Sequence, residues 1–263
     1  MLQQATLKKV VNELFRALQT NTQIAPLKKQ WPEMTVDDAY AISMKTLALR
    51  TRHNGEIVTG KKVGITSAAV QEFMGALQPD FGFLTDAMVY QDGAEINLAT
   101  TLIQPRVEAE IGFILNRDLR GPGVTEHDVL DATAAIAPCF EIVDSRIKDW
   151  RIKIEDTIAD NASCGGYVLG GTRACAKDHD LSQLHVELRK NGHTLSQGHS
   201  SIVLGNPLTA VAWLANALPH FGHHLRCGEV VLSGSVVTPA PVVAGDLMEM
   251  TLSGVGNATI KFT

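Results

Sequence analysis

Two carboxylates stand two residues apart in the segment QPRVEAEIGFIL, residues 104–115. The segment has the pattern of a strand, and successive strand side chains point to opposite faces, so Glu108 and Glu110 share one face. A third acid, Glu141, lies in the otherwise apolar segment PCFEIV. Three carboxylates gathered in an apolar setting raise one another's pKa, and a bound divalent cation removes that penalty. Oxygen ligands with no histidine or cysteine at a suitable spacing predict Mg²⁺ or Mn²⁺ rather than zinc.

A solvated strand face is the simpler explanation of the pair Glu108 and Glu110. Two features weigh against it. Glu141 lies in an apolar stretch, and Gly112, on the same face as the pair, leaves room for a ligand to approach. We therefore interpret the three acids as a candidate metal site.

A lysine between two glycines is the second candidate feature. If TGKKVGIT is a strand, Lys62 shares one face with Gly60 and Gly64, which have no side chains to cover it. It could be an edge-strand lysine that discourages aggregation. Alternatively, its ammonium group could meet a small anionic ligand lying against the bare backbone.

Three further segments carry polar residues that ordinary turn chemistry could also explain. In QPDFGFLTD, the two aspartates flank what we predict to be a glycine-containing turn. The segments DNASCGG and LSGS hold an asparagine and several serines. The candidates are Asp80, Asp86, Asn161, Ser163, Ser233 and Ser235.

The elements that must position these residues are helical first and then strand-rich. An apolar stripe predicts a helix over residues 7–18, and Thr35 is the expected N-cap of a second helix that ends near Gly55. Farther on, we predict strands at 56–66, 106–115 and 137–146, a short helix capped by Ser67, and a helix from Thr125 to about Ile136.

The second half is mostly strand and turn. A hairpin with Asn191-Gly192 at its tip precedes a helix that has Asn206 as its cap and Pro207 at its first position. Strands at 228–237 and 246–262 close the chain. The sum is an α+β protein with a helical portion over 1–55 and a mixed β catalytic domain over 56–263, which could also count as one domain.

Bulk composition excludes several classes. The 263 residues are 45% hydrophobic and 19% charged, as in ordinary globular proteins, and the net charge of −5 without a basic run argues against nucleic-acid binding. We see no segment approaching the ~20 apolar residues that cross a bilayer, and no signal-type N-terminus, so we expect a cytosolic protein. The four cysteines fit neither a CxxC nor a zinc pattern, and we expect reduced thiols.

Taken together and in order, several segments resemble one family over nearly the whole chain: GKKVGITS, QPDFGFLTDAMVY, QPRVEAEIGFIL, GPGVT, CFEIVDSRIKDW, DTIADNASCG, NPLTAVAWLAN and LSGSVV. They are similar to the 2-keto-4-pentenoate (2-hydroxypenta-2,4-dienoate) hydratases, of the hydratase/decarboxylase family in the fumarylacetoacetate hydrolase superfamily. The resemblance implies a mixed β-roll body, hydration of a dienoate in the meta-cleavage pathway of aromatic catabolism, and a homo-oligomer.

The resemblance also implies roles for residues. The family's E-x-E pair and later glutamate match Glu108, Glu110 and Glu141 as metal ligands. Its G-x-K-x-G lysine matches Lys62, and its aspartate after proline matches Asp80, our candidate for proton transfer. We further expect Asn161, Ser163 and Ser235 to bind substrate.

Three alternatives stay open. A 4-oxalocrotonate decarboxylase would need a basic side chain for the distal carboxylate, for which Arg146, Arg151 and Lys153 are candidates. A catalytically silent partner of a related decarboxylase is disfavoured because the acids and Lys62 are intact. A C–C bond hydrolase commonly uses a histidine base, and the nine histidines show no supporting motif.

Overall fold

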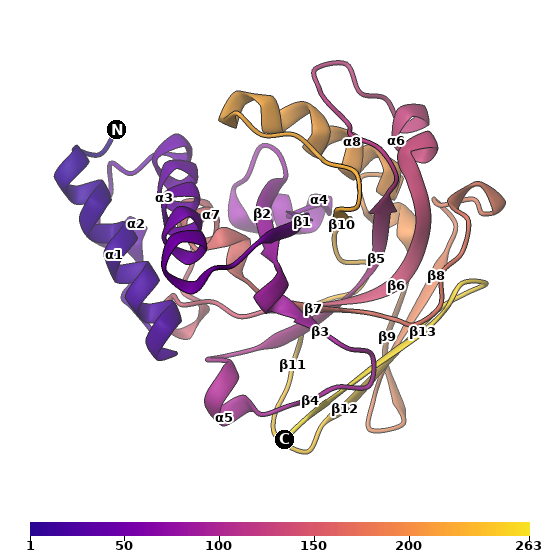
Figure 1. Cartoon of the computed structure of the whole chain (residues 1–263). Helices are drawn as coiled ribbons and strands as arrows, with labels where there is room; N and C mark the ends of the chain where they lie inside the picture. Colours follow the sequence, from indigo (N-terminus) through magenta and orange to yellow (C-terminus); the bar gives the residue numbers. More distant parts are fainter.

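The N-terminal helices lie to one side of a strand-rich body in the computed structural model, which describes residues 1–263 (Figure 1). The apolar stripe of the first helix is buried, and Thr35 is the N-cap of the third helix, as expected, where it forms a capping box with Asp38. A π-turn over Arg50–Asn54 and Gly55 in a left-handed conformation end this portion, as predicted. The helices are α1 (Gln4–Thr20), α2 (Leu27–Gln30) and α3 (Val36–Leu49).

The larger of two sheets has eight strands and mixed pairing. Seven follow the order β2-β1-β10-β5-β6-β7-β3, and β11 pairs with one end of β5. Figure 1 shows this sheet curling through the centre of the molecule. Its strands are β1 (Val58–Gly64), β2 (Asp80–Thr85), β3 (Val89–Tyr90), β5 (Arg106–Leu115), β6 (Thr133–Val143), β7 (Cys164–Leu169), β10 (Val230–Leu232) and β11 (Ala240–Pro241).

The second sheet has five strands in the order β4-β13-β12-β8-β9. The hairpin of β8 and β9 has Asn191 and Gly192 at its tip, both at positive φ, as its sequence predicted. These strands are β4 (Glu95–Ile96), β8 (His185–Lys190), β9 (His193–His199), β12 (Leu247–Leu252) and β13 (Gly256–Phe262). The predicted α+β class with a curled β body is confirmed, and the division of the chain at residue 55 stays a prediction.

The other helices are short connections between strands. They are α4 (Ala68–Met74), α5 (Leu98–Thr101), α6 (Glu126–Ala132), α7 (Ile154–Ala159) and α8 (Pro207–Ala217). Single 3₁₀ turns span Asp86–Met88, Ala176–Asp178, Ser200–Ile202 and Leu218–Phe221, whereas Lys148–Trp150 and Asn161–Ser163 are turns that contain residues at positive φ. Ser67 and Asn206 cap α4 and α8 as predicted.

Two predicted boundaries are wrong. The helix expected to reach Ile136 ends at Ala132, because the chain from Thr133 onward pairs along β5 and this ladder outweighs the helical pattern. The strand expected over 228–237 is shorter than predicted, because only Val230–Leu232 pair as a strand, β10. Beyond it, left-handed Gly234 turns the chain.

The prediction of a turn around Gly82 is also wrong, because this segment forms the strand β2. Its aromatic residues pack inward, with the Phe81 ring stacked 4.5 Å from that of Tyr40 in α3. A Cβ at Gly82 would lie 2.5 Å from the carbonyl oxygen of Asn161, so the glycine allows a neighbouring segment to approach and does not make a turn.

One stretch, Ser200–Phe221, is long and apolar enough by composition to cross a membrane, although the sequence analysis found none. It consists of α8 flanked by two 3₁₀ turns. Half of it is buried inside the body, as in the core helix of a globular protein.

Candidate active site

Strand register brings the three acids together. In the antiparallel pair β5–β6, Glu108 lies directly opposite Glu141, and Glu110 follows on the same face. Each residue offers one carboxylate oxygen such that all three oxygens lie within 4.8 Å of one another. The grouping predicted from two separate segments is therefore present in the fold.

These carboxylates are not a solvated face. Glu110 and Glu141 are fully buried. The main-chain N–H of Gly234 donates to Glu110 Oε2 at 2.8 Å, but Glu110 Oε1 and both carboxylate oxygens of Glu141 make no hydrogen bond, although Glu141 Oε1 forms an ion pair with Lys62. Burial, with the charge of Glu141 nearby, raises the pKa of Glu108 to about 8 and that of Glu110 well above its usual range.

This geometry fits a divalent cation. Buried carboxylate oxygens without donors are rare in proteins, since each forfeits its solvation without compensation. A cation with three oxygen ligands would compensate them, and an all-oxygen donor set suits Mg²⁺ or Mn²⁺.

Lys62 lies on the same face of the sheet as the acids. It pairs with Leu232 of β10, which in turn pairs with Gly112 of β5, and paired residues point to one side. Its Nζ lies 3.3 Å from Glu141 Oε1. Burial lowers the pKa of this amine, but the nearby carboxylates outweigh burial and raise it. The edge-strand explanation is wrong, because β1 lies between β2 and β10.

Asp80 completes the cluster across β1. It pairs with Gly64, where an added Cβ would overlap Asp80 Oδ1 and lie 3.1 Å from Lys62 Nζ. The glycine thus lets the acid and the lysine meet over bare backbone. Asp80 is buried, and its Oδ1 has no hydrogen-bond partner. Burial raises the pKa of Asp80 to about 6, although Lys62 opposes the shift.

The room expected beside Gly112 is not open. A Cβ at Gly112 would lie 2.6 Å from Leu169 Cδ2, so the β7 leucine occupies that space. The glycine that makes room in the site is Gly64.

The side chains of the other three candidates are engaged within the protein. Asn161 bonds both the N–H and the carbonyl of Phe83, at 2.8 and 2.9 Å. Ser163 Oγ lies 3.1 Å from Thr157 Oγ1, and Ser235 donates to the Val237 carbonyl at 2.6 Å. Their contacts with substrate stay predictions.

The structure draws attention to two further residues: Ser233, a candidate that turn chemistry could also have explained, and Tyr40. Ser233 is fully buried, and its Oγ has no hydrogen-bond partner. It precedes Gly234, whose N–H holds Glu110, so the LSGS segment belongs to the site. Tyr40 brings α3 to the residue after Asp80, and no sequence signal marked it.

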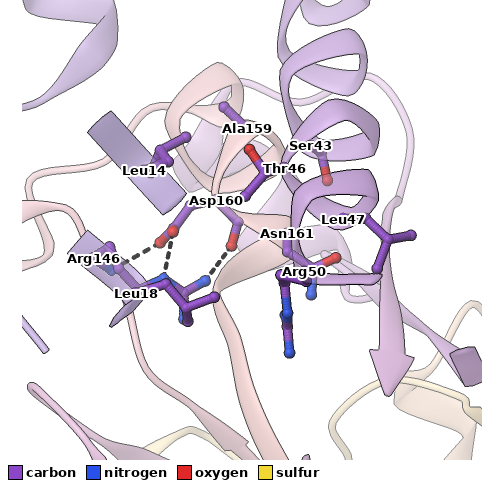
Figure 2. Close-up of a pocket in the computed structure, with 10 residues that line it drawn as sticks. All are labelled: Leu14, Leu18, Ser43, Thr46, Leu47, Arg50, Arg146, Ala159, Asp160 and Asn161. Atoms are coloured by element: carbon purple, nitrogen blue, oxygen red, sulfur yellow. Dashed lines mark hydrogen bonds and ion pairs between the residues drawn. The ribbon is translucent and has the colours of Figure 1, made fainter. Parts of the chain in front are cut away.

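Arg146 is held in a buried ion pair with Asp160. Figure 2 shows its pairing with Asp160, at 2.5 Å, next to Asn161 and the α3 residues Ser43 and Thr46. Arg146 is buried and also donates to main-chain carbonyls, including that of Asp144 at 2.6 Å.

The two other basic candidates are exposed. Arg151 pairs with Asp149 at 3.3 Å on the surface, and Lys153 is exposed as well. Arg146 is thus paired with Asp160 and Arg151 with Asp149, whereas Lys153 makes no ion pair and is exposed.

Comparisons with known proteins identify the family of the chain. The Fumarylacetoacetate (FAA) hydrolase C-terminal family matches residues 59–263. A 2-hydroxyhexa-2,4-dienoate hydratase of Comamonas testosteroni is 53% identical over 95% of both chains. A 2-hydroxypent-2,4-dienoate hydratase of Pseudomonas putida is 52% identical over 80% of this chain and 95% of the relative.

Solved structures share the fold over the full length. The 4-oxalocrotonate decarboxylase of Pseudomonas putida G7, complexed with magnesium and adipate, superimposes with a TM-score of 0.95 at 32% identity, covering 100% of this chain and 99% of that one. The family match and these relatives establish that the chain belongs to the hydratase/decarboxylase family of the fumarylacetoacetate hydrolase superfamily.

Proposed function

We propose that this protein is a metal-dependent hydro-lyase that adds water to a short 2-hydroxy-2,4-dienoate and yields a 4-hydroxy-2-oxo acid in aromatic catabolism. The observation that carries the proposal is the cluster of three carboxylates, of which Glu110 and Glu141 are buried with oxygens that make no hydrogen bond, and which contacts Lys62 through Glu141. Named hydratases at 52–53% identity support this reaction.

The order of steps follows from the electronics of the substrate. A dienol is electron-rich and does not accept water readily. Protonation at C5 first gives an enone, whose C4 is electrophilic, and addition of water at C4 then places negative charge on the C2 oxygen. A site that tolerates this charge and moves protons is therefore required.

The residues present fit these two requirements. A divalent cation held by Glu108, Glu110 and Glu141 would supply Lewis acidity for the C1 carboxylate and the C2 oxygen. Lys62, cationic and buried, would give the same end of the substrate a second positive contact. Asn161, Ser163 and Ser235, with Ser233, would orient the substrate.

Asp80 would carry the proton. Its pKa of about 6 lets the carboxyl exchange protons near neutral pH, which is the condition for efficient acid–base catalysis. Its donor-free Oδ1 lies over Gly64 beside Lys62 and is not committed to another protein group.

Decarboxylation of 2-oxo-3-hexenedioate is the alternative, since the superimposed decarboxylase shares the fold. One observation favours hydration: the named hydratases are the more similar in sequence, at 53% identity against 32% for the decarboxylase. The proposal includes both five- and six-carbon dienoates, because relatives are named for each.

We also propose a cytosolic homo-oligomer that uses Mg²⁺ or Mn²⁺, with a related decarboxylase as a possible partner. Solved relatives complexed with magnesium, calcium or Mn²⁺ support a divalent cation at the site.

The test is spectrophotometric. Wild-type protein, stripped with chelator and reloaded with Mg²⁺, should consume the dienol without releasing CO₂, and Glu108→Gln should lose this turnover. Glu95→Gln, a change on the exposed Lys261 ion pair, is the matched control. Normal Mg²⁺-dependent turnover by Glu108→Gln would remove the metal assignment, and CO₂ release from the hexenedioate would replace hydration by decarboxylation.

A further inference from the structure

A large cavity lies outside the catalytic cluster, at the start of β5. It has a volume of about 730 Å³, within the range of small-molecule sites, and eight of its fourteen lining residues are hydrophobic. The segment 97–106 forms one wall and the segment 241–244 the other. None of the three glutamates, Lys62 or Asp80 lines it.

Arg106 is the one charged side chain in this lining. Its guanidinium makes no ion pair or hydrogen bond within the chain and lies 4.7 Å from the centre of the Trp150 ring. The buried arginines behave differently, because Arg50 pairs with Glu56 and Arg146 with Asp160. A half-buried guanidinium on an aromatic platform keeps its donors available for a carboxylate.

The Trp150 ring is held in place by its backbone conformation and by a hydrogen bond. Asp149 and Trp150 both hold left-handed backbone conformations, at φ 57° and 53°, which non-glycine residues adopt only when their surroundings enforce them. The Trp150 indole N–H donates to the Gln104 carbonyl at 3.0 Å. A rigid aromatic wall reduces the ordering cost of binding a flat ligand.

The wall that carries Arg106, residues 97–106, is anchored as well. The Asp144 carboxylate accepts the main-chain N–H groups of Ile103 and Gln104, at 2.7–3.0 Å. This acid is thereby satisfied and does not neutralise Arg106. Glu108, two residues from Arg106 on β5, makes no ion pair with it, and Asp149, next to Trp150, pairs with Arg151.

We propose that this cavity is a second binding site, which takes a small organic carboxylate with a flat apolar body. The carboxylate would receive the Arg106 N–H groups, and the body would lie along Trp150 and the aliphatic walls. Arg106 and Glu108 are two residues apart on one strand, so the site adjoins the catalytic cluster but does not share its residues.

The probe is benzoate, titrated by calorimetry into Mg²⁺-loaded protein, with neutral benzamide as the control ligand. We expect a Kd on the order of 1 mM for benzoate and no measurable binding of benzamide. Arg106→Gln should weaken benzoate at least about tenfold, and Trp150→Leu severalfold. Arg151→Gln, the matched control one residue beyond Trp150, and Lys62→Ala, which removes the cation of the catalytic cluster, should both bind as wild type does.

Three results would overturn the proposal. Benzoate binding that survives Arg106→Gln, or that disappears in Lys62→Ala, would place the anion elsewhere. A wild-type protein that binds no benzoate would remove the site, and a changed oligomeric state of Arg106→Gln in light scattering would then identify the cavity as an interface between copies. Thermal melts of each variant check that it is folded.

Discussion

At the residue scale, the site depends on a glycine, Gly64, at a position where a side chain would not fit. Gly64 lets Asp80 and Lys62 occupy the space where any other residue would carry its Cβ. The sequence indicated that a lysine between glycines could meet a ligand. It did not show which glycine matters, because that depends on the strand paired opposite.

Gly64→Ala should therefore disable catalysis while leaving the fold intact. The added methyl would displace two side chains but no backbone, so we expect kcat/KM to fall by about 100-fold with a small change in melting temperature. Gly171→Ala is the control, since its Cβ would meet nothing closer than Asp92 Oδ2 at 3.8 Å. A fully active Gly64→Ala would show that the two side chains need not meet.

Asp80→Asn tests the proton carrier. The amide keeps the shape of the side chain but cannot exchange a proton near neutral pH, so kcat should fall by a factor of about 10² to 10⁴. Mn²⁺ binding should persist, because Asp80 is outside the cluster of three glutamates. A wild-type kcat would assign proton transfer to another group.

At the element scale, the helical portion is tied to the sheet by a buried polar network. Glu56 Oε2 accepts from Arg50, at the end of α3, at 2.6 Å and from Thr85 of β2 at 2.6 Å. The network thus joins the helices to the strand that begins at Asp80. The bonds that this buried carboxylate accepts are lost on unfolding, so they stabilise the folded state.

Glu56→Gln should lower the free energy of unfolding by about 2–3 kcal/mol at pH 7. Burial raises the pKa of Glu56, but the bonds from Arg50 and Thr85 outweigh it and lower the pKa. The stabilisation is therefore present above the unfolded-state pKa, about 4.3, and is lost as pH falls through the folded-state value. Denaturant titrations should show the difference between wild type and Glu56→Gln closing in acid, and a constant difference would contradict this assignment.

Asn161 supports β2 from the other side. Because it has φ 59°, Asn161→Gly removes its two bonds to Phe83 without straining the backbone. We expect a loss of about 1–3 kcal/mol of stability together with a lower kcat. KM should rise as well, because Asn161 is proposed to orient the substrate, and kinetics equal to the wild type would leave it with a structural role alone.

Local elements could be predicted from the sequence, whereas pairings between distant segments could not. The capping boxes, the Asn191-Gly192 hairpin and β5 rest on short-range patterns, and they are present. β2 was missed because Pro79, Asp80 and Gly82 are typical of turns, while the need for Gly82 comes from Asn161, far along the chain. The opposition of Glu108 and Glu141 is likewise a matter of register.

At the scale of the whole molecule, a bound cation would join β5 to β6 through Glu108, Glu110 and Glu141 and so stabilise the native state. At a free concentration of 100 Kd, Mg²⁺ should add about 2.7 kcal/mol to the free energy of unfolding. Calorimetric melts should therefore shift upward with Mg²⁺ and return with chelator. Glu141→Gln, already relieved of one buried charge, should show little Mg²⁺ response, and an undiminished response would argue for a cation site elsewhere.

The most direct measurement of the central claim is a titration of the protein with Mn²⁺, in which free Mn²⁺ is followed by its electron paramagnetic resonance signal. The account predicts one tight Mn²⁺ per chain in the wild type, displaced by Mg²⁺. Binding should be weakened at least about tenfold in Glu108→Gln, Glu110→Gln and Glu141→Gln, but unchanged in Glu95→Gln. Equal Mn²⁺ binding by the wild type and all three site variants would contradict it.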